Sequence, residues 1–114
     1  MPLDAGDRAL IYDMLEAARH LQAMWRNRSL AELLDDRTLQ WAPDRGLNII
    51  GEAARRVSDL TKAKNDGADW RRIVGLQNVV VHDYNEVDYR RHWRVIQEDL
   101  PKLIVELEKI WSEA

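Results

Sequence analysis

The sequence contains no cysteine, few glycines and no long apolar run. Without cysteine the chain can form neither a disulfide framework nor a thiolate metal site, which is typical of proteins in reducing compartments. Its five glycines are scattered, so they form no loop that could cradle a phosphate. No segment approaches the roughly 18 consecutive apolar residues of a membrane span, so we expect no membrane association.

An excess of positive charge is also missing. The chain has 17 Lys and Arg against 20 Asp and Glu, a formal net charge of -3. Any contact with nucleic acid must therefore come from a local basic patch or from an assembly. The first residues carry acidic side chains ahead of the apolar positions, unlike the basic start of a signal peptide, and we expect a cytoplasmic location.

Size and composition predict one folded domain. The chain has 114 residues, of which 46% are hydrophobic and 32% charged, as in soluble globular proteins rather than disordered ones. A chain of this length can build one core but is short for two. We therefore expect a single domain over residues 1–114.

The first half of the chain has the pattern of amphipathic helices. Between residues 7 and 26 apolar residues recur at three- and four-residue steps, which predicts a helix. Residues 27–29 break this pattern. Ser29 followed by Glu32 is a capping-box arrangement, which predicts a short second helix that ends near Leu34.

A third helical segment is predicted over residues 38–64, where apolar residues again follow the helical period, with its uninterrupted part at residues 45–62. Asp36 and Thr38 are both candidate N-caps for this segment. Pro43 and Gly46 are expected to kink or delay its first turns.

The fourth helix follows a turn at residues 65–67 and is predicted over residues 69–82, with Asp69 as its N-cap. The valines at 79–81 are also compatible with a strand. We favour a helix, because the segment follows the 3.6-residue period and no other segment offers a strand partner.

A fifth helix is predicted from about residue 88 to residue 111, with Pro101 bending or splitting it at Leu100. No repeat or linker is present. The pattern therefore predicts an all-α fold, a compact bundle of four to five helices.

A polar cluster lies at the end of the fourth helix. Asn78 and His82 are four residues apart and share a helix face, with Asp83 and Tyr84 directly after them. A histidine titrates near neutrality and can move the protons that phosphodiester cleavage by a ribose 2′-hydroxyl requires. The alternative is a histidine that only caps the helix C-terminus. The three histidines have no metal-binding spacing, and we predict neither a metal site nor another cofactor.

Two groups of arginines could supply phosphate-binding charge near His82. One is Arg71 and Arg72, and the other is Arg90, Arg91 and Arg94. The alternative is a solvated face with the side-chain stems over the core. Arg71 is eleven residues before His82, about 16 Å along a helix, so within one chain it cannot easily reach the same phosphate.

Five tryptophans are predicted to be packing residues rather than platforms for stacked bases, because most lie on apolar stripes. Trp41 fits a stripe least well. The five are Trp25, Trp41, Trp70, Trp93 and Trp111.

Three strings together resemble the HepT-like branch of the HEPN superfamily over nearly the entire chain. They are NIIGEAARRVSDL from Asn48, DWRRIVGLQNVVVHDY from Asp69 and EVDYRRHWRVIQEDLPKL from Glu86. The resemblance implies an all-α homodimer and a metal-independent ribonuclease toxin, whose R-x4-6-H motifs from two subunits form one site. It also implies an MNT-type nucleotidyltransferase antitoxin, which transfers AMP to a tyrosine in R-x4-H-x-Y.

By this resemblance the motif histidine is His82 and the modified tyrosine is Tyr84. The motif arginine falls on Gln77, whose amide lacks the charge and the bidentate grip of a guanidinium. We expect Gln77 and Asn78 to help hold the phosphate, with Arg71 and Arg72 as further contacts.

Two other readings remain open. One is a catalytically inactive HEPN module that binds a nucleotidyltransferase or nucleic acid, and the other is a purely structural dimerisation bundle. Loss of RNA cleavage on replacing His82 would separate the ribonuclease from both.

Overall fold

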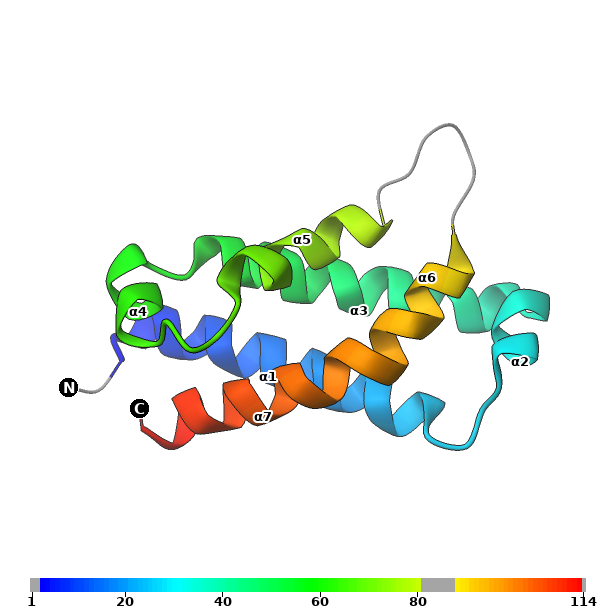
Figure 1. Ribbon diagram of the computed structural model, residues 1–114, viewed down its shortest axis with the longest axis horizontal. Helices are drawn as coiled ribbons and strands as arrows, with labels where there is room; N and C mark the ends of the chain where they lie inside the picture. Colours follow the sequence, from blue (N-terminus) through cyan, green and yellow to red (C-terminus); the bar gives the residue numbers. More distant parts are fainter. Residues whose placement is uncertain (1–2, 81–87, 114) are drawn as a thin grey trace.

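The computed structural model describes residues 3–80 and 88–113, and these residues contain no strand. This confirms the all-α fold (Figure 1). In chain order the elements are α1 (Ala5–Trp25), α2 (Leu30–Asp35), α3 (Arg37–Arg56), α4 (Asp59–Lys64), α5 (Trp70–Val80), α6 (Tyr89–Arg94), the π-helical segment η1 (Val95–Asp99) and α7 (Leu100–Ser112).

The long helices stack side by side. Helix α1 contacts both α3 and α7, and α5 lies on the other side of α3 (Figure 1). The apolar stripe of α1 is almost completely buried, including Ile11, Met14 and Leu21. Within the described residues, no helix is long and apolar enough to cross a membrane.

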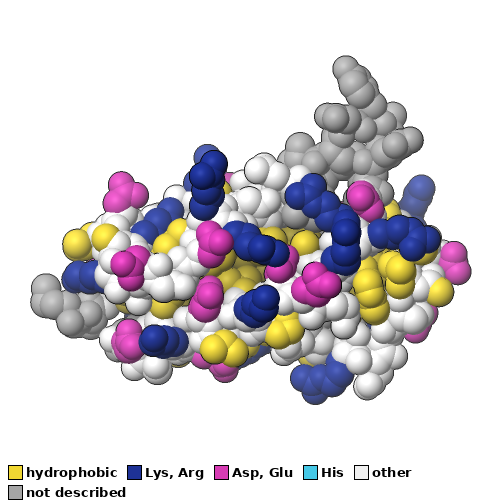
Figure 2. All heavy atoms as spheres, viewed as in Figure 1, with side chains coloured by type: hydrophobic (Ala, Val, Ile, Leu, Met, Phe, Trp, Pro, Cys, Tyr) yellow, Lys and Arg dark blue, Asp and Glu magenta, His cyan; other side chains and the backbone are white. Residues whose placement is uncertain are grey.

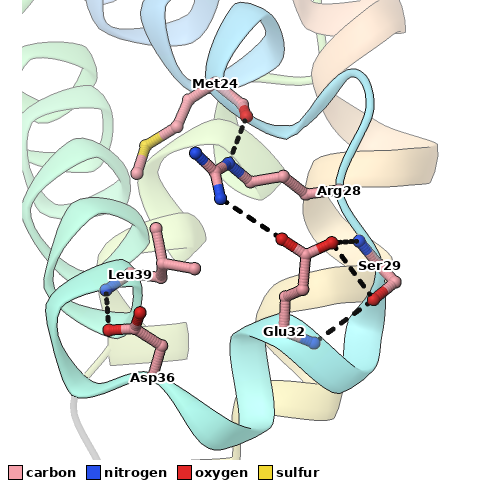
Figure 3. Close-up of polar contacts among 6 residues, drawn as sticks. All are labelled: Met24, Arg28, Ser29, Glu32, Asp36 and Leu39. Carbon is pink, nitrogen blue, oxygen red and sulfur yellow. Dashed lines mark hydrogen bonds and ion pairs between the residues drawn. The ribbon is translucent and has the colours of Figure 1, made fainter.

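The turn from α1 to α2 has the predicted capping box. Ser29 Oγ accepts a hydrogen bond from Glu32 N at 3.3 Å, and Glu32 Oε1 accepts one from Ser29 N at 3.1 Å (Figure 3). Arg28 pairs with Glu32 at 3.2 Å. Asp36, rather than Thr38, caps α3, because its carboxylate accepts from the backbone N–H groups of Thr38 and Leu39.

The third helix starts where the predicted caps place it, but its predicted end and its delayed first turns are wrong. Helix α3 begins at Arg37 and continues through Pro43 and Gly46, so neither residue delays it. It ends at Arg56, and Ser58 then caps the separate helix α4. The apolar period continues across this break, and the break was therefore not visible in the pattern.

A buried carboxylate explains the break. Asp7 of α1 is only 4% exposed and accepts hydrogen bonds from Ser58 N at 3.0 Å, Ser58 Oγ at 2.5 Å and Thr61 Oγ1 at 2.5 Å. Burial alone would raise the pKa of Asp7, but these hydrogen bonds together hold the pKa below its ordinary value. The first turn of α1 is thereby tied to the α3–α4 junction.

The last predicted helix is split, as expected, before Pro101. Leu100 N–H bonds to Val95 O across the wider π turn of η1, and Pro101 then stands in the first turn of α7. A proline lacks the N–H for an α-helical bond, and we attribute the π turn to it. The fourth helix is confirmed as helix through Val80, with Asp69 accepting from Arg72 N at 3.2 Å.

The tryptophans pack as predicted, except for Trp41. Trp25 is 1% exposed, and the ring of Trp93 meets it edge-on with 5.9 Å between centroids. Trp70 and Trp111 are partly buried against the core. Trp41 is 64% exposed, so it is not a packing residue of this chain.

Replacing Asp7 by Asn should lower the free energy of unfolding at pH 7 by about 1–3 kcal/mol, because a buried acceptor network loses its charge and geometry. Because the pKa of Asp7 is lowered in the folded protein, its stabilising effect is fully present above the unfolded-state pKa of 3.8. The effect is lost as the pH falls through the folded-state pKa. Urea unfolding between pH 3 and pH 7 measures both effects. Asp13→Asn, on the exposed side of the same helix, is the control. Equal stabilities of the two variants would contradict this role.

Candidate functional site

Helix α5 carries the described part of the predicted motif. Gln77 is partly buried and Asn78 is exposed near the end of this helix. His82, Asp83 and Tyr84 lie outside the described residues, which stop at Val80 and resume at Asp88. The described part of the candidate site therefore consists of the contacts that hold α5 and α6, the helices on either side of residues 81–87.

Helices α3 and α5 lie in close contact where Gly51 faces Gln77. A Cβ atom added to Gly51 would lie 2.6 Å from both the N and the Cβ of Gln77 and 3.0 Å from its Cα. Cβ atoms essentially never approach non-bonded backbone atoms as closely as 2.6 Å, so a side chain at position 51 would push the two helices apart. The backbone of α5 is thereby fixed against α3 at the motif position itself.

The side chain of Gln77 is held by two residues of α3. Gln77 Nε2 donates to Asn48 Oδ1 at 3.2 Å and to Glu52 Oε2 at 3.2 Å. Glu52 also accepts from Arg55, at 2.7 Å and 2.9 Å. The Arg55 hydrogen bond is the main cause that lowers the pKa of Glu52; burial opposes it, and the Gln77 hydrogen bond lowers it further. Position 77 thus faces an ionised carboxylate.

Helix α6, after the motif, is also attached to α3. His92 is fully buried, with its Nδ1 3.3 Å from Asp44 Oδ1. Tyr89 meets the His92 ring edge-on, with 5.2 Å between centroids. Burial, followed by the charge of Asp44 and a hydrogen bond to it, raises the pKa of Tyr89. The neutral phenol therefore persists at physiological pH.

Asp44, Asn48 and Glu52 recur every four residues and so share one face of α3. This polar stripe contacts α5 through Gln77 and α6 through His92. Both helices that border residues 81–87 are thus anchored on the same face of α3. This polar stripe was not predicted from the sequence. The four-residue spacing of its three polar residues within a predicted helix was the signal that could have indicated it.

The predicted phosphate contacts have different surroundings. Arg71 and Arg72 are both exposed, and Arg72 Nη2 lies 2.5 Å from Asp99 Oδ1. Neither arginine is placed against Gln77 by a described contact. Over residues 3–80 and 88–113, no three His, Asp or Glu side chains are grouped as metal ligands would be.

Comparison with known proteins bears on this arrangement. A family model described as "Ribonuclease HepT-like" matches residues 14–110. The chain belongs to the HepT-like ribonuclease family. The family resemblance predicted from the three strings is therefore confirmed.

Two relatives show how far the similarity to this family extends. A Methanocaldococcus jannaschii protein named "Putative RNase" is 33% identical over 101 residues, which cover 89% of this chain and 93% of that protein. A Thermococcus cleftensis protein named "Probable ribonuclease HepT" is 31% identical over 98 residues, covering 86% and 89%. No solved structure gave a significant match. The roles of His82, Gln77, Asn78 and Tyr84 in this HepT-like chain stay predictions.

Replacing Gly51 by Ala should lower the free energy of unfolding by about 1–3 kcal/mol, the usual cost of overpacking, because α5 must move away from α3. The shift should also loosen the Gln77 contacts. Chemical unfolding measures the loss. Gly75→Ala on α5 is the matched control, since a Cβ there meets no atom within 4 Å and should be neutral or stabilising. A Gly51→Ala protein as stable as the control would refute the close crossing.

Proposed function

We propose that this HepT-like protein is a metal-independent endoribonuclease, the toxin of a HEPN/MNT toxin–antitoxin pair, and that it works as a homodimer. Membership of the family and the ribonuclease names of its relatives support cleavage of RNA. The toxin role, the dimer and the MNT-type nucleotidyltransferase partner rest on the resemblance of the motif region.

The proposed chemistry is attack of a ribose 2′-oxygen on the adjacent phosphorus. One His82 accepts the 2′-hydroxyl proton as the 2′-oxygen bonds to phosphorus and the P–O5′ bond breaks. The protonated His82 of the partner subunit gives its proton to the leaving 5′-oxygen. Asn78 donates to one non-bridging oxygen, and Gln77 donates to another by turning one Nε2 hydrogen from Asn48 or Glu52 to the phosphate. No step in this scheme consumes a cofactor.

The contact of Gln77 with α3 is the observation that carries the proposal. Asn48 and Glu52 hold residue 77 at the start of the motif, as a site built on rigid elements requires. A guanidinium at position 77 would face the carboxylate of Glu52, and this contact would hold it on the α3 side of α5. The neutral amide keeps the position but supplies no charge to the phosphate.

The same contact supports a second candidate, a catalytically inactive module that binds a nucleotidyltransferase or nucleic acid. The Gln77 amide is engaged by two protein oxygens and carries no charge. Loss of one charge contact to a transition state commonly costs about 10²- to 10³-fold in rate. A chain with this substitution can keep the fold and the partners while it loses the reaction.

In the toxin–antitoxin scheme, Tyr84 is the residue to which the antitoxin adds AMP. The modification would bring bulk and negative charge to the place where RNA phosphates approach. Repulsion and steric exclusion would then block RNA binding. Intact-mass measurement after incubation with a nucleotidyltransferase partner and ATP, with Tyr84→Phe as control, tests this step.

Gln77→Arg should raise the rate of RNA cleavage by about 10²- to 10³-fold, because it restores one charge contact to the phosphate. His82→Ala should abolish cleavage in the natural and in the Gln77→Arg background. The assay uses total cellular RNA in EDTA, with folding of each variant checked by circular dichroism.

Each result selects one candidate. Activity of the natural protein that disappears with His82→Ala supports the ribonuclease. If the natural protein does not cleave RNA but the Gln77→Arg variant does, the result supports a module that is inactive because position 77 lacks an arginine. Cleavage that persists in His82→Ala, or an inactive Gln77→Arg protein, would contradict the proposed catalytic roles.

A further inference from the structure

A groove lies between α5 and the α6–η1 segment, beside the Gln77 contact. Its volume is about 410 Å³, and it is lined by Arg72, Gly75, Leu76, Arg91, Arg94, Val95, Glu98 and Asp99. All of these residues belong to the described part of the chain. The groove is not the α3 face that holds Gln77.

Three arginines line this groove in a chain whose net charge is -3. Arg72 on the α5 side is already paired with Asp99. Among the residues that the structure describes, no carboxylate oxygen lies within 4.0 Å of the Arg91 or Arg94 guanidinium. In the space-filling view, Lys and Arg side chains gather over α6 (Figure 2). Within the described parts of the chain, Arg91 and Arg94 are therefore the groove's cations without a carboxylate partner.

Arg91 and Arg94 are three residues apart on a helix, so they project from neighbouring positions, with Cβ atoms about 5–6 Å apart. Asp88 caps this helix by accepting from Arg91 N at 3.2 Å, which fixes its start. Two guanidinium groups on neighbouring positions of one helix can each bind a phosphate through a planar pair of donors.

The floor of the groove has little side-chain bulk. Gly75 contributes no side chain, and a Cβ added there would meet no atom within 4 Å. Leu76 and Val95 close the bottom as buried apolar residues. The other wall includes the π turn of η1, a feature that often accompanies functional sites. The groove thus combines a shallow apolar floor with a cationic wall.

We propose that this groove binds the ribose-phosphate backbone of single-stranded RNA, with Arg91 and Arg94 contacting phosphates and Arg72 held in place by Asp99. The inference rests on the proposed ribonuclease function and extends it to the path of the substrate. Gly75 and Leu76 directly precede Gln77, so RNA lying in the groove is level with the motif position along α5, on a different face of that helix. An acidic protein segment is the competing occupant.

Binding of a 5′-labelled, fully 2′-O-methylated RNA oligonucleotide tests the proposal by fluorescence anisotropy over a series of salt concentrations. This probe lacks the 2′-hydroxyl, so binding is measured without cleavage. The Arg91→Gln/Arg94→Gln double variant should bind more weakly. Its salt slope should be smaller by about 1.4, since each phosphate contact on a single strand contributes about 0.7.

Two further variants act on the groove without removing an arginine. Gly75→Glu places a carboxylate on the open floor and should weaken binding. Glu98→Gln removes a negative charge from the lining and should strengthen it. The control is Arg19→Gln/Arg26→Gln, on α1 and at its C-cap, which removes the same total charge from residues outside the groove and should leave the salt slope unchanged.

The proposal is overturned if the double variant keeps the natural affinity and salt slope, or if the α1 control loses as much slope. It is also overturned if Arg91→Gln/Arg94→Gln leaves RNA binding intact but abolishes binding of an acidic peptide, which would make the groove a protein-docking surface. Natural protein that binds the probe through the arginines but cleaves no RNA would refute the ribonuclease function and support the groove.

Discussion

The close contact of α3 with α5 at Gly51 is the constraint on which the rest of the site depends. A side chain at position 51 would meet the backbone of Gln77, so the approach of the two helices is set by the absence of one Cβ atom. This approach brings Asn48 and Glu52 within hydrogen-bond distance of residue 77. The position of residue 77 is thus determined by the packing of α5 on α3.

Helix α3 acts as a common support. Its polar stripe contacts α5 through Gln77 and α6 through His92, while its end is tied to α1 through Asp7 and Ser58. The two helices that border residues 81–87 therefore both have side-chain contacts with α3. The same arrangement leaves an open groove on the other side of α5, lined by arginines that the α3 stripe does not use.

Much of the fold follows from local signals in the sequence. The capping box at Ser29, the cap at Asp69 and the split before Pro101 each depend on residues within one or two turns, and each was predictable. The end of α3 at Arg56 was not, because the decisive partner, Asp7, lies 51 residues before Ser58. Pro43 also misled the prediction, since the helix tolerates it on a buried face.

The site was predictable in its motif but not in its support. The family resemblance pointed to position 77, whereas the residues that hold Gln77 come from a different helix and carry no motif. Arg72 illustrates the same limit: its spacing suggested a phosphate contact, but Asp99, 27 residues later, pairs with it in the fold. Pairings of this kind depend on tertiary packing, which spacing alone does not specify.

The most direct measurement is a double-mutant cycle on RNA cleavage in EDTA, combining Gln77→Arg with Glu52→Gln. If α3 positions residue 77, the gain in rate from Gln77→Arg should largely disappear in the Glu52→Gln background, since the guanidinium is then no longer held. The same gain in both backgrounds would show that residue 77 works without its α3 partners and would contradict the central role of this contact.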